Sequence, residues 1–207
     1  ASDVYKRQAN IPDTCVVAGS FLSFLVNASD PDGDNLDLDA IGGPISEVEN
    51  AANFSDLGAG IGQFVWSPEC TEVREAPYQV VVRAEDNSGQ VQLMDLETFQ
   101  IRVVAPPAEM TAAEPVGNAI LLEWNAHECT GELPGWKSSA GRYHIYRRVD
   151  SLDWTPHSCE TGIPDTSGFT VLGTVEGLDN TAYIDDDLLS FGATYCYRLV
   201  TAWPGSG

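Results

Sequence analysis

Lysine, methionine and histidine are scarce in this chain of 207 residues, which has only two lysines, Lys6 and Lys137. Acidic residues outnumber basic ones by 31 to 10, and the formal net charge is −21. Such a charge disfavours binding to nucleic acid or to anionic membranes and favours cations as small partners. No apolar run approaches the ~20 residues of a membrane span. No signal peptide begins the sequence, so for an exported protein we expect the true N-terminus to lie upstream.

Helical patterning is also missing, because no segment repeats apolar residues every three or four positions. Apolar and polar residues instead alternate with period two in many short runs, which is typical of half-buried β-strands. The length exceeds a usual domain of roughly 100 to 150 residues. The sequence therefore predicts an all-β protein with two tandem β-sandwich domains. The residues expected to face the first core are Leu22, Phe24, Val26, Ala28, Leu36, Leu38, Ala40, Phe64, Trp66, Tyr78, Val80, Val82, Ala84, Phe99, Ile101 and Val103.

The start of the chain differs from the rest. The segment Asp3-Val4-Tyr5-Lys6-Arg7-Gln8 matches the translation of a transposon end that is used in sequencing libraries. We therefore expect residues 1–9 to be a sequencing-adapter artefact and a disordered start. The remaining sequence is then a piece of a longer protein.

A proline pair marks the predicted domain boundary. The segment Ala105-Pro106-Pro107-Ala108 interrupts the alternation, and neither proline can donate a hydrogen bond to a sheet. The predicted domains are residues 10–105 and 106–207. The second core is expected to contain Ile120, Leu122, Trp124, Tyr143, Ile145, Tyr183, Tyr195, Tyr197, Leu199 and Thr201.

The second half resembles a fibronectin type III domain. The resemblance is carried by Leu122-Glu123-Trp124, by Tyr143-His144-Ile145-Tyr146-Arg147 and by Gly192-Ala193-Thr194-Tyr195-Cys196-Tyr197. It implies that Tyr195 forms a tyrosine corner, whose hydroxyl bonds back to the preceding turn. A complete domain of this family has a seventh strand, and the sequence ends before one, so we expect the domain to lack its last strand.

The first half resembles bacterial cadherin-like and immunoglobulin-like repeats. This resemblance is carried by the stretch from Val26 to Asp34 and by the stretch from Ala84 to Gly89. The order of the two domains is similar to that of large Bacteroidetes surface proteins that carry a gliding-motility-associated sorting domain and leave by type IX secretion. The resemblance implies an extracellular or cell-surface location and a role as spacer or adhesion modules.

The five cysteines suggest two disulfides and one leftover thiol, as is usual for exported β-proteins. Placement on a sandwich of this type pairs Cys15 with Cys70, and pairs Cys129 with Cys159. Cys196 then stays unpaired, because the strand that would hold its partner is missing. A weaker alternative is a zinc site made by the two cysteines Cys129 and Cys159 and the histidines two residues before them.

Two acidic loops are the candidate metal site. In a sandwich of this type the loop after the second strand lies beside the loop after the sixth, and alternate carboxylates of a tight turn can converge on one calcium ion. The acidic end is expected to face an upstream domain. The candidate ligands are Asp30, Asp32, Asp34, Glu85, Asp86 and Asn87. No cofactor is required, and the structural alternative is that Asp, Asn and Gly serve only the turns.

The sequence therefore favours non-catalytic spacer or adhesion modules of a large secreted bacterial surface protein, stiffened by calcium at the upstream junction. The expected partners are neighbouring domains of the same chain, surface proteins or carbohydrate, and we expect a monomer. The alternative is a pair of ancillary carbohydrate-binding or protein-binding domains of a secreted hydrolase, with sugar contacts through Trp136 or Trp154. An enzyme that uses the acidic loops is disfavoured, because no histidine lies near them in the sequence.

Overall fold

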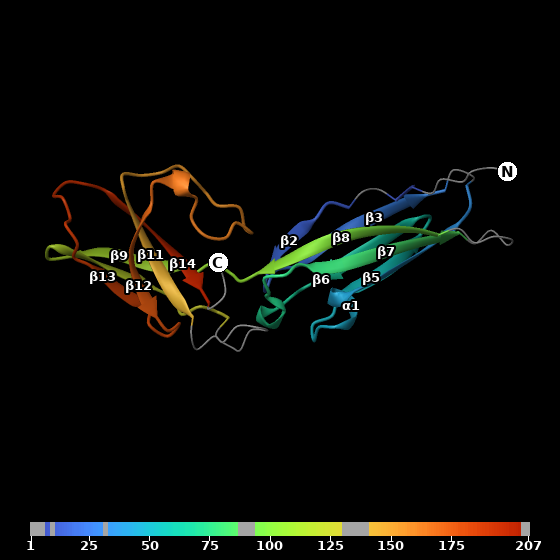
Figure 1. Ribbon diagram of the computed structural model, residues 1–207, viewed down its shortest axis with the longest axis horizontal. Coiled ribbons are helices and arrows are strands. Elements are labelled where there is room, and N and C mark those ends of the chain that lie inside the picture. The colour runs from blue at the N-terminus through green and yellow to red at the C-terminus, as the bar shows by residue number, and fades with distance from the viewer. Residues whose placement is uncertain (1–6, 9–10, 31–32, 87–93, 130–140, 204–207) are drawn as a thin grey trace. The chain divides into compact units, whose positions relative to one another are not determined.

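The computed structural model describes most of the chain as two compact units, Ala1–Val104 and Ala105–Gly207 (Figure 1). The described residues are 7–8, 11–30, 33–86, 94–129, 141–203. Both units consist of β-strands in two sheets, which confirms the predicted all-β tandem sandwich. The boundary lies one residue before the predicted one. No helix in these ranges is long and apolar enough to cross a membrane.

Unit 1 contains two four-stranded sheets. Their strand orders are β1-β3-β6-β5 and β2-β8-β7-β4. All neighbours are antiparallel except β2 and β8, which run parallel. The bounds are β1 (Arg7–Gln8), β2 (Thr14–Val17), β3 (Leu22–Ser29), β4 (Leu36–Gly42), β5 (Asn53–Gly58), β6 (Ile61–Trp66), β7 (Tyr78–Asp86) and β8 (Met94–Val104), with one-turn helices α1 (Gly43–Ser46) and η1 (Cys70–Glu72).

Alternation of side chains builds the core of unit 1. Strand β7 shows the pattern most clearly, because every second residue from Tyr78 to Asp86 is buried. Rings from both sheets meet in the centre: Phe24 stacks on Phe64, and Phe99 packs edge-on against both. Strand β7 pairs with β8, which carries Phe99, and β7 ends at Asp86.

The expected disordered start is wrong in part. Arg7 and Gln8 form strand β1, which pairs with Ser29 and Ala28 of β3. Strand pairing uses backbone groups, so almost any extended segment can join an open sheet edge. The origin of residues 1–9 stays a prediction. The pairing brings the chain into unit 1 beside the end of β3.

Unit 2 contains two three-stranded sheets, ordered β13-β10-β9 and β12-β11-β14. All pairs are antiparallel. The core is centred on Leu122, Trp124, Tyr143 and Ile145, all of which are buried. The bounds are β9 (Met110–Val116), β10 (Ala119–Trp124), β11 (Arg142–Val149), β12 (Thr170–Glu176), β13 (Ala182–Asp185) and β14 (Tyr195–Ala202), with a short 3-10 turn η3 (Asp165–Ser167).

Candidate functional site

Three aspartates converge at one end of unit 1. Asp30 directly follows β3, Asp34 lies two residues before β4, and Asp86 ends β7. One carboxylate oxygen from each lies within 4.8 Å of the others. The turn between the first two is closed by a 3.2 Å bond from the Gly33 amide to the Asp30 carbonyl, and Gly33 has a φ of 81°, which favours glycine. The fold thus gathers carboxylates from both sheets.

The spacing of these oxygens fits a calcium ion. Calcium binds oxygen ligands at about 2.3 to 2.6 Å, so two ligands on opposite sides of an ion lie about 5 Å apart or less. Asp86 is 2% exposed, whereas Asp34 is exposed. The three aspartates therefore offer one buried ligand at the end of a strand, Asp86, and two ligands at the turn that follows β3. Calcium takes six to eight oxygens, so other ligands must complete the shell.

The other predicted ligands do not join this cluster in the described structure. Glu85 lies on the opposite face of β7, because neighbouring side chains on a strand alternate, and its carboxylate is 3.8 Å from the guanidinium of Arg83. Arg83 also contacts Asp39 at 3.4 Å. Asp32 and Asn87 lie outside the described residues. Strand periodicity could have separated Glu85 from Asp86 in the sequence.

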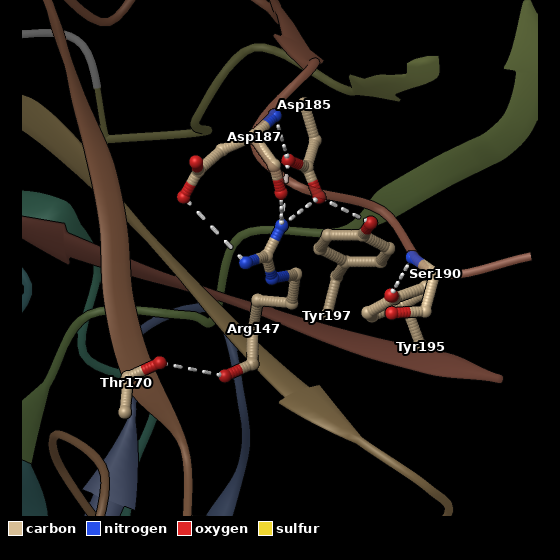
Figure 2. Close-up of polar contacts among 7 residues, drawn as sticks. All are labelled: Arg147, Thr170, Asp185, Asp187, Ser190, Tyr195 and Tyr197. Atoms are coloured by element: carbon tan, nitrogen blue, oxygen red, sulfur yellow. Dashed lines mark hydrogen bonds and ion pairs between the residues drawn. The ribbon is translucent and has the colours of Figure 1, made fainter. Parts of the chain in front are cut away.

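Unit 2 holds a buried charged cluster that sequence reasoning missed (Figure 2). The Arg147 guanidinium donates from one nitrogen to both carboxylate oxygens of Asp185, at 2.8 and 3.0 Å. The Tyr197 hydroxyl donates to the same carboxylate at 2.6 Å, and Asp187 lies 3.7 Å from the guanidinium. Asp185 belongs to one sheet, while Arg147 and Tyr197 belong to the other, so the cluster joins the two sheets. The sequence did contain a signal for this cluster, because period-two alternation places Asp185 on the same face of its strand as Tyr183, which was expected to face the core.

This cluster shifts the titration of its members. Burial and the hydrogen bond to Asp185 raise the pKa of Tyr197 well above its ordinary value of about 10. The neighbouring carboxylate keeps Arg147 protonated and raises its pKa despite the opposing effect of burial. The arrangement therefore holds the positive charge of Arg147 in place beside the Asp185 carboxylate.

Tyr195 makes the contact that defines a tyrosine corner. The Ser190 amide donates a 2.6 Å hydrogen bond to the Tyr195 hydroxyl, in the turn that precedes β14 (Figure 2). The Arg147 guanidinium lies 5.4 Å from the centre of the Tyr195 ring, which is within cation–π range. The corner and the charged cluster therefore share one arginine.

Four cysteines are disulfide-bonded, and Cys196 is a half-buried free thiol on β14. The pairing of Cys15, Cys70, Cys129 and Cys159 stays a prediction. The zinc alternative is wrong, because the cysteines that it needs are oxidised and both ring nitrogens of His127 are occupied. Nδ1 accepts from the Cys129 amide at 3.0 Å, and Nε2 donates to the Pro106 carbonyl at 2.8 Å.

Of the two tryptophans proposed for sugar contact, Trp154 lies within the described residues. Trp154 is half-buried, and the guanidinium of Arg198 lies 5.5 Å from its ring centre. The same guanidinium donates to the Trp154 carbonyl at 3.1 Å. One ring face is thus used in packing onto β14, which leaves less of the indole for a ligand. Trp136 lies outside the described residues.

Comparison with known proteins adds similarity of fold only. No family model and no curated protein matches the sequence. Solved structures that resemble it include titin domains A168–A170, with 13% identity, 96% of this chain and 60% of that chain covered, and a TM-score of 0.38. The SrpA adhesin of Streptococcus sanguinis has 11% identity, with 56% of this chain and 69% of that chain covered, and a TM-score of 0.39. A DUF4785 family protein of Legionella pneumophila has 12% identity, with 96% of this chain and 47% of that chain covered, and a TM-score of 0.47. The chain spans 60% of the titin chain and 47% of the Legionella chain.

Proposed function

We propose that this chain is a non-catalytic spacer or adhesion segment of a large secreted bacterial surface protein, and that its acidic end binds calcium at a junction with an upstream domain. The observation that carries the proposal is the convergence of Asp30, Asp34 and Asp86 within 4.8 Å.

The cluster is half of a calcium shell by its chemistry. Each of the three aspartates offers one carboxylate oxygen, so together they supply three of the six to eight oxygens that calcium takes. A neighbouring domain that supplied further oxygens would raise the affinity of the site for calcium. The shared ion would then fix the orientation of that domain relative to unit 1. Calcium would then stiffen the protein, and its removal would make the junction flexible. The resemblance of the sequence to gliding-motility-associated Bacteroidetes proteins supports export by the type IX route as the context.

Calorimetric titration of residues 1–207 with calcium tests the site. We expect weak binding, with a dissociation constant on the order of 10⁻⁴ to 10⁻³ M, which is the range of extracellular modules. Asp86→Asn removes the buried ligand and should abolish this binding. Glu85→Gln is the matched control, because it changes the charge equally at the next residue, on the opposite face of β7.

The outcomes separate a site from a diffuse charge effect. Loss of binding in Asp86→Asn with retention in Glu85→Gln supports the calcium site. Equal weakening in both variants would mean that calcium only screens the acidic surface. No detectable binding at millimolar calcium would refute the site in this chain.

A second candidate function is carbohydrate or protein binding beside a secreted hydrolase. It rests on Trp154 of the long β11–β12 connection, whose side chain stays half-exposed although one ring face packs against Arg198. Binding to a glycan array that disappears in Trp154→Ala and persists in Trp124→Phe, a substitution in the core, would support this candidate. An array without any bound glycan would leave the spacer function in place.

A further inference from the structure

Strands β3, β6 and β5 of unit 1 present an outer face without charged side chains. Side chains alternate along these strands, so Phe24 and Phe64 point into the core and every second residue points outward. The outward residues are Ser23, Leu25, Asn27, Ser29, Asn53, Ser55, Ile61, Gln63 and Val65. None of these residues is charged, although charged residues make up 20% of the chain and its net charge is −21. We call this surface the uncharged face.

The outer face of the other sheet in unit 1 has the opposite character. Its strands β4, β7 and β8 alternate in the same way, and their outward residues include Asp37, Asp39, Arg83, Glu85 and Arg102. The strand architecture therefore does not explain the lack of charge on the uncharged face. Depletion of charge is the feature that separates the core of a protein–protein interface from the rest of a protein surface. The contrast between the two sheets thus marks the uncharged face as a contact surface.

Apolar side chains within the uncharged face are open to solvent. Leu25 is 55% exposed, and Ile61 and Val65 on the central strand β6 are half-exposed. The register places Val65 between Ser23 and Asn53, so apolar and polar side chains are interspersed. Covering this face would remove apolar area from water and would desolvate none of the charges of the chain at its centre.

The polar side chains of the face are complementary to copies of themselves. The amides of Asn and Gln and the hydroxyl of Ser both donate and accept hydrogen bonds, so two identical side chains can pair. A carboxylate or a guanidinium would instead meet its own charge across a two-fold axis. A cationic partner would be drawn to the acidic surfaces elsewhere on the chain. The uncharged face therefore suits a partner that is itself acidic, and a second copy of this chain is such a partner.

Gln63 lies at the centre of the uncharged face. It belongs to the central strand of the three, and its four neighbours on the face are Leu25, Ser55, Ile61 and Val65. Because an amide both donates and accepts, two Gln63 side chains can form reciprocal hydrogen bonds when the two-fold axis passes between them.

We propose that the uncharged face binds the same face of a second copy of this chain, forming a two-fold dimer in which the two Gln63 side chains pair at the axis. This departs from the monomer that the sequence favours. It is independent of the proposed calcium site, because Asp30, Asp34 and Asp86 do not belong to the face. Three strands of about six residues make a face of roughly 14 by 20 Å, which is small beside the ~800 Å² per partner of a standard interface. The dimer is therefore weak and transient, and salt should strengthen it by screening the repulsion between two acidic chains.

NMR spectra of ¹⁵N-labelled residues 1–207 over about 10 μM to 1 mM, at low and at physiological salt, test a contact of this size. We expect concentration-dependent shifts at the backbone amides of β3, β5 and β6, and larger shifts at the higher salt. Leu25→Glu brings two carboxylates into the contact and should weaken the dimer by at least about tenfold. Leu96→Glu is the matched control, because Leu96 is 53% exposed on the outer face of the other sheet. It should leave the shifts unchanged.

Opposite charges at Gln63 test the two-fold pairing. Gln63→Glu and Gln63→Lys should each weaken self-association, because each variant opposes like charges at the axis. An equimolar mixture of the two variants should associate more strongly than either variant alone, which a folding defect would not produce.

Three results would overturn the proposal. Spectra that do not change with concentration would show that no dimer forms, and shifts confined to other strands would show that a different surface is used. A mixture that associates no better than the single variants would show that the two Gln63 side chains do not meet at the axis.

Discussion

The hydroxyl of Tyr197 donates a 2.6 Å hydrogen bond to Oδ2 of Asp185, a carboxylate that is only 1% exposed. The same carboxylate accepts two bonds from Arg147. A buried charge is tolerated when it is paired and fully hydrogen-bonded, and it becomes costly when a partner is removed. Unit 2 therefore depends on this cluster for the docking of its two sheets.

Asp185→Asn should destabilise unit 2 by about 3 kcal/mol, because it leaves the half-buried Arg147 guanidinium with only the exposed Asp187 as an ion-pair partner. Asp187→Asn is the matched control. Asp187 approaches the same guanidinium at 3.7 Å, but its side chain is 64% exposed, so its loss should cost at most about 1 kcal/mol. Urea denaturation measures both. Equal losses would show that burial does not set the strength of these ion pairs.

Tyr197→Phe should cost about 1.5 to 3 kcal/mol, since it removes one hydrogen bond to a charged group and leaves the rest of the cluster in place. Burial and the bond to Asp185 raise the pKa of Tyr197. Burial also raises the pKa of Tyr78, Tyr143 and Tyr183, so alkaline absorbance titration of the native protein should show several late-ionising tyrosines, and the variant should lose one tyrosine from the latest step. An unchanged titration curve would contradict the assignment.

Acidification should destabilise unit 2 through His127. Burial lowers the pKa of His127 below its ordinary value of about 6.5, and its Nδ1 accepts from the Cys129 amide, which requires the neutral ring. Below about pH 6.5 the unfolded chain therefore binds a proton that the folded chain resists, so stability falls as pH is lowered.

Thermal melts at pH 7.5 and pH 5.0 check this dependence. The native protein should lose more stability between the two values than His127→Gln, which has no ring to titrate. His144→Gln provides the control, because His144 is a half-buried surface histidine that contacts the Thr174 hydroxyl at 3.0 Å. A native-like pH dependence in His127→Gln would exclude His127 as its source.

Two glycines in the β5–β6 turn should differ in their tolerance of alanine. Gly58 and Gly60 both have positive φ, of 80° and 71°. A Cβ on Gly58 would meet nothing within 4 Å, whereas a Cβ on Gly60 would meet the carbonyl oxygen of Ala28. We expect Gly58→Ala to cost about 1 to 2 kcal/mol and Gly60→Ala about 3 kcal/mol or more. Chemical denaturation compares them, and equal costs would show that the backbone moves aside.

Much of the architecture could be predicted because alternation is a local property. Strands β4 and β7 bury the residues that period two indicated, such as Leu38 and Val82. The same rule was not carried to the ends of the strands, where it separates Glu85 from Asp86. The rule was also not applied to charged residues, so Asp185 was missed although it lies two residues after Tyr183, on the same face of the strand.

The sequence by itself determined the two β-sandwiches, their boundary near Ala105 and the acidic end of the first, because hydrophobic period, proline chemistry and charge are written in consecutive residues. Only the tertiary structure decided which charges meet. Asp30 and Asp86 lie in different sheets and Arg147 and Asp185 lie 38 positions apart. Such contacts follow from how two sheets face each other, and no local sequence pattern shows which distant residues will meet.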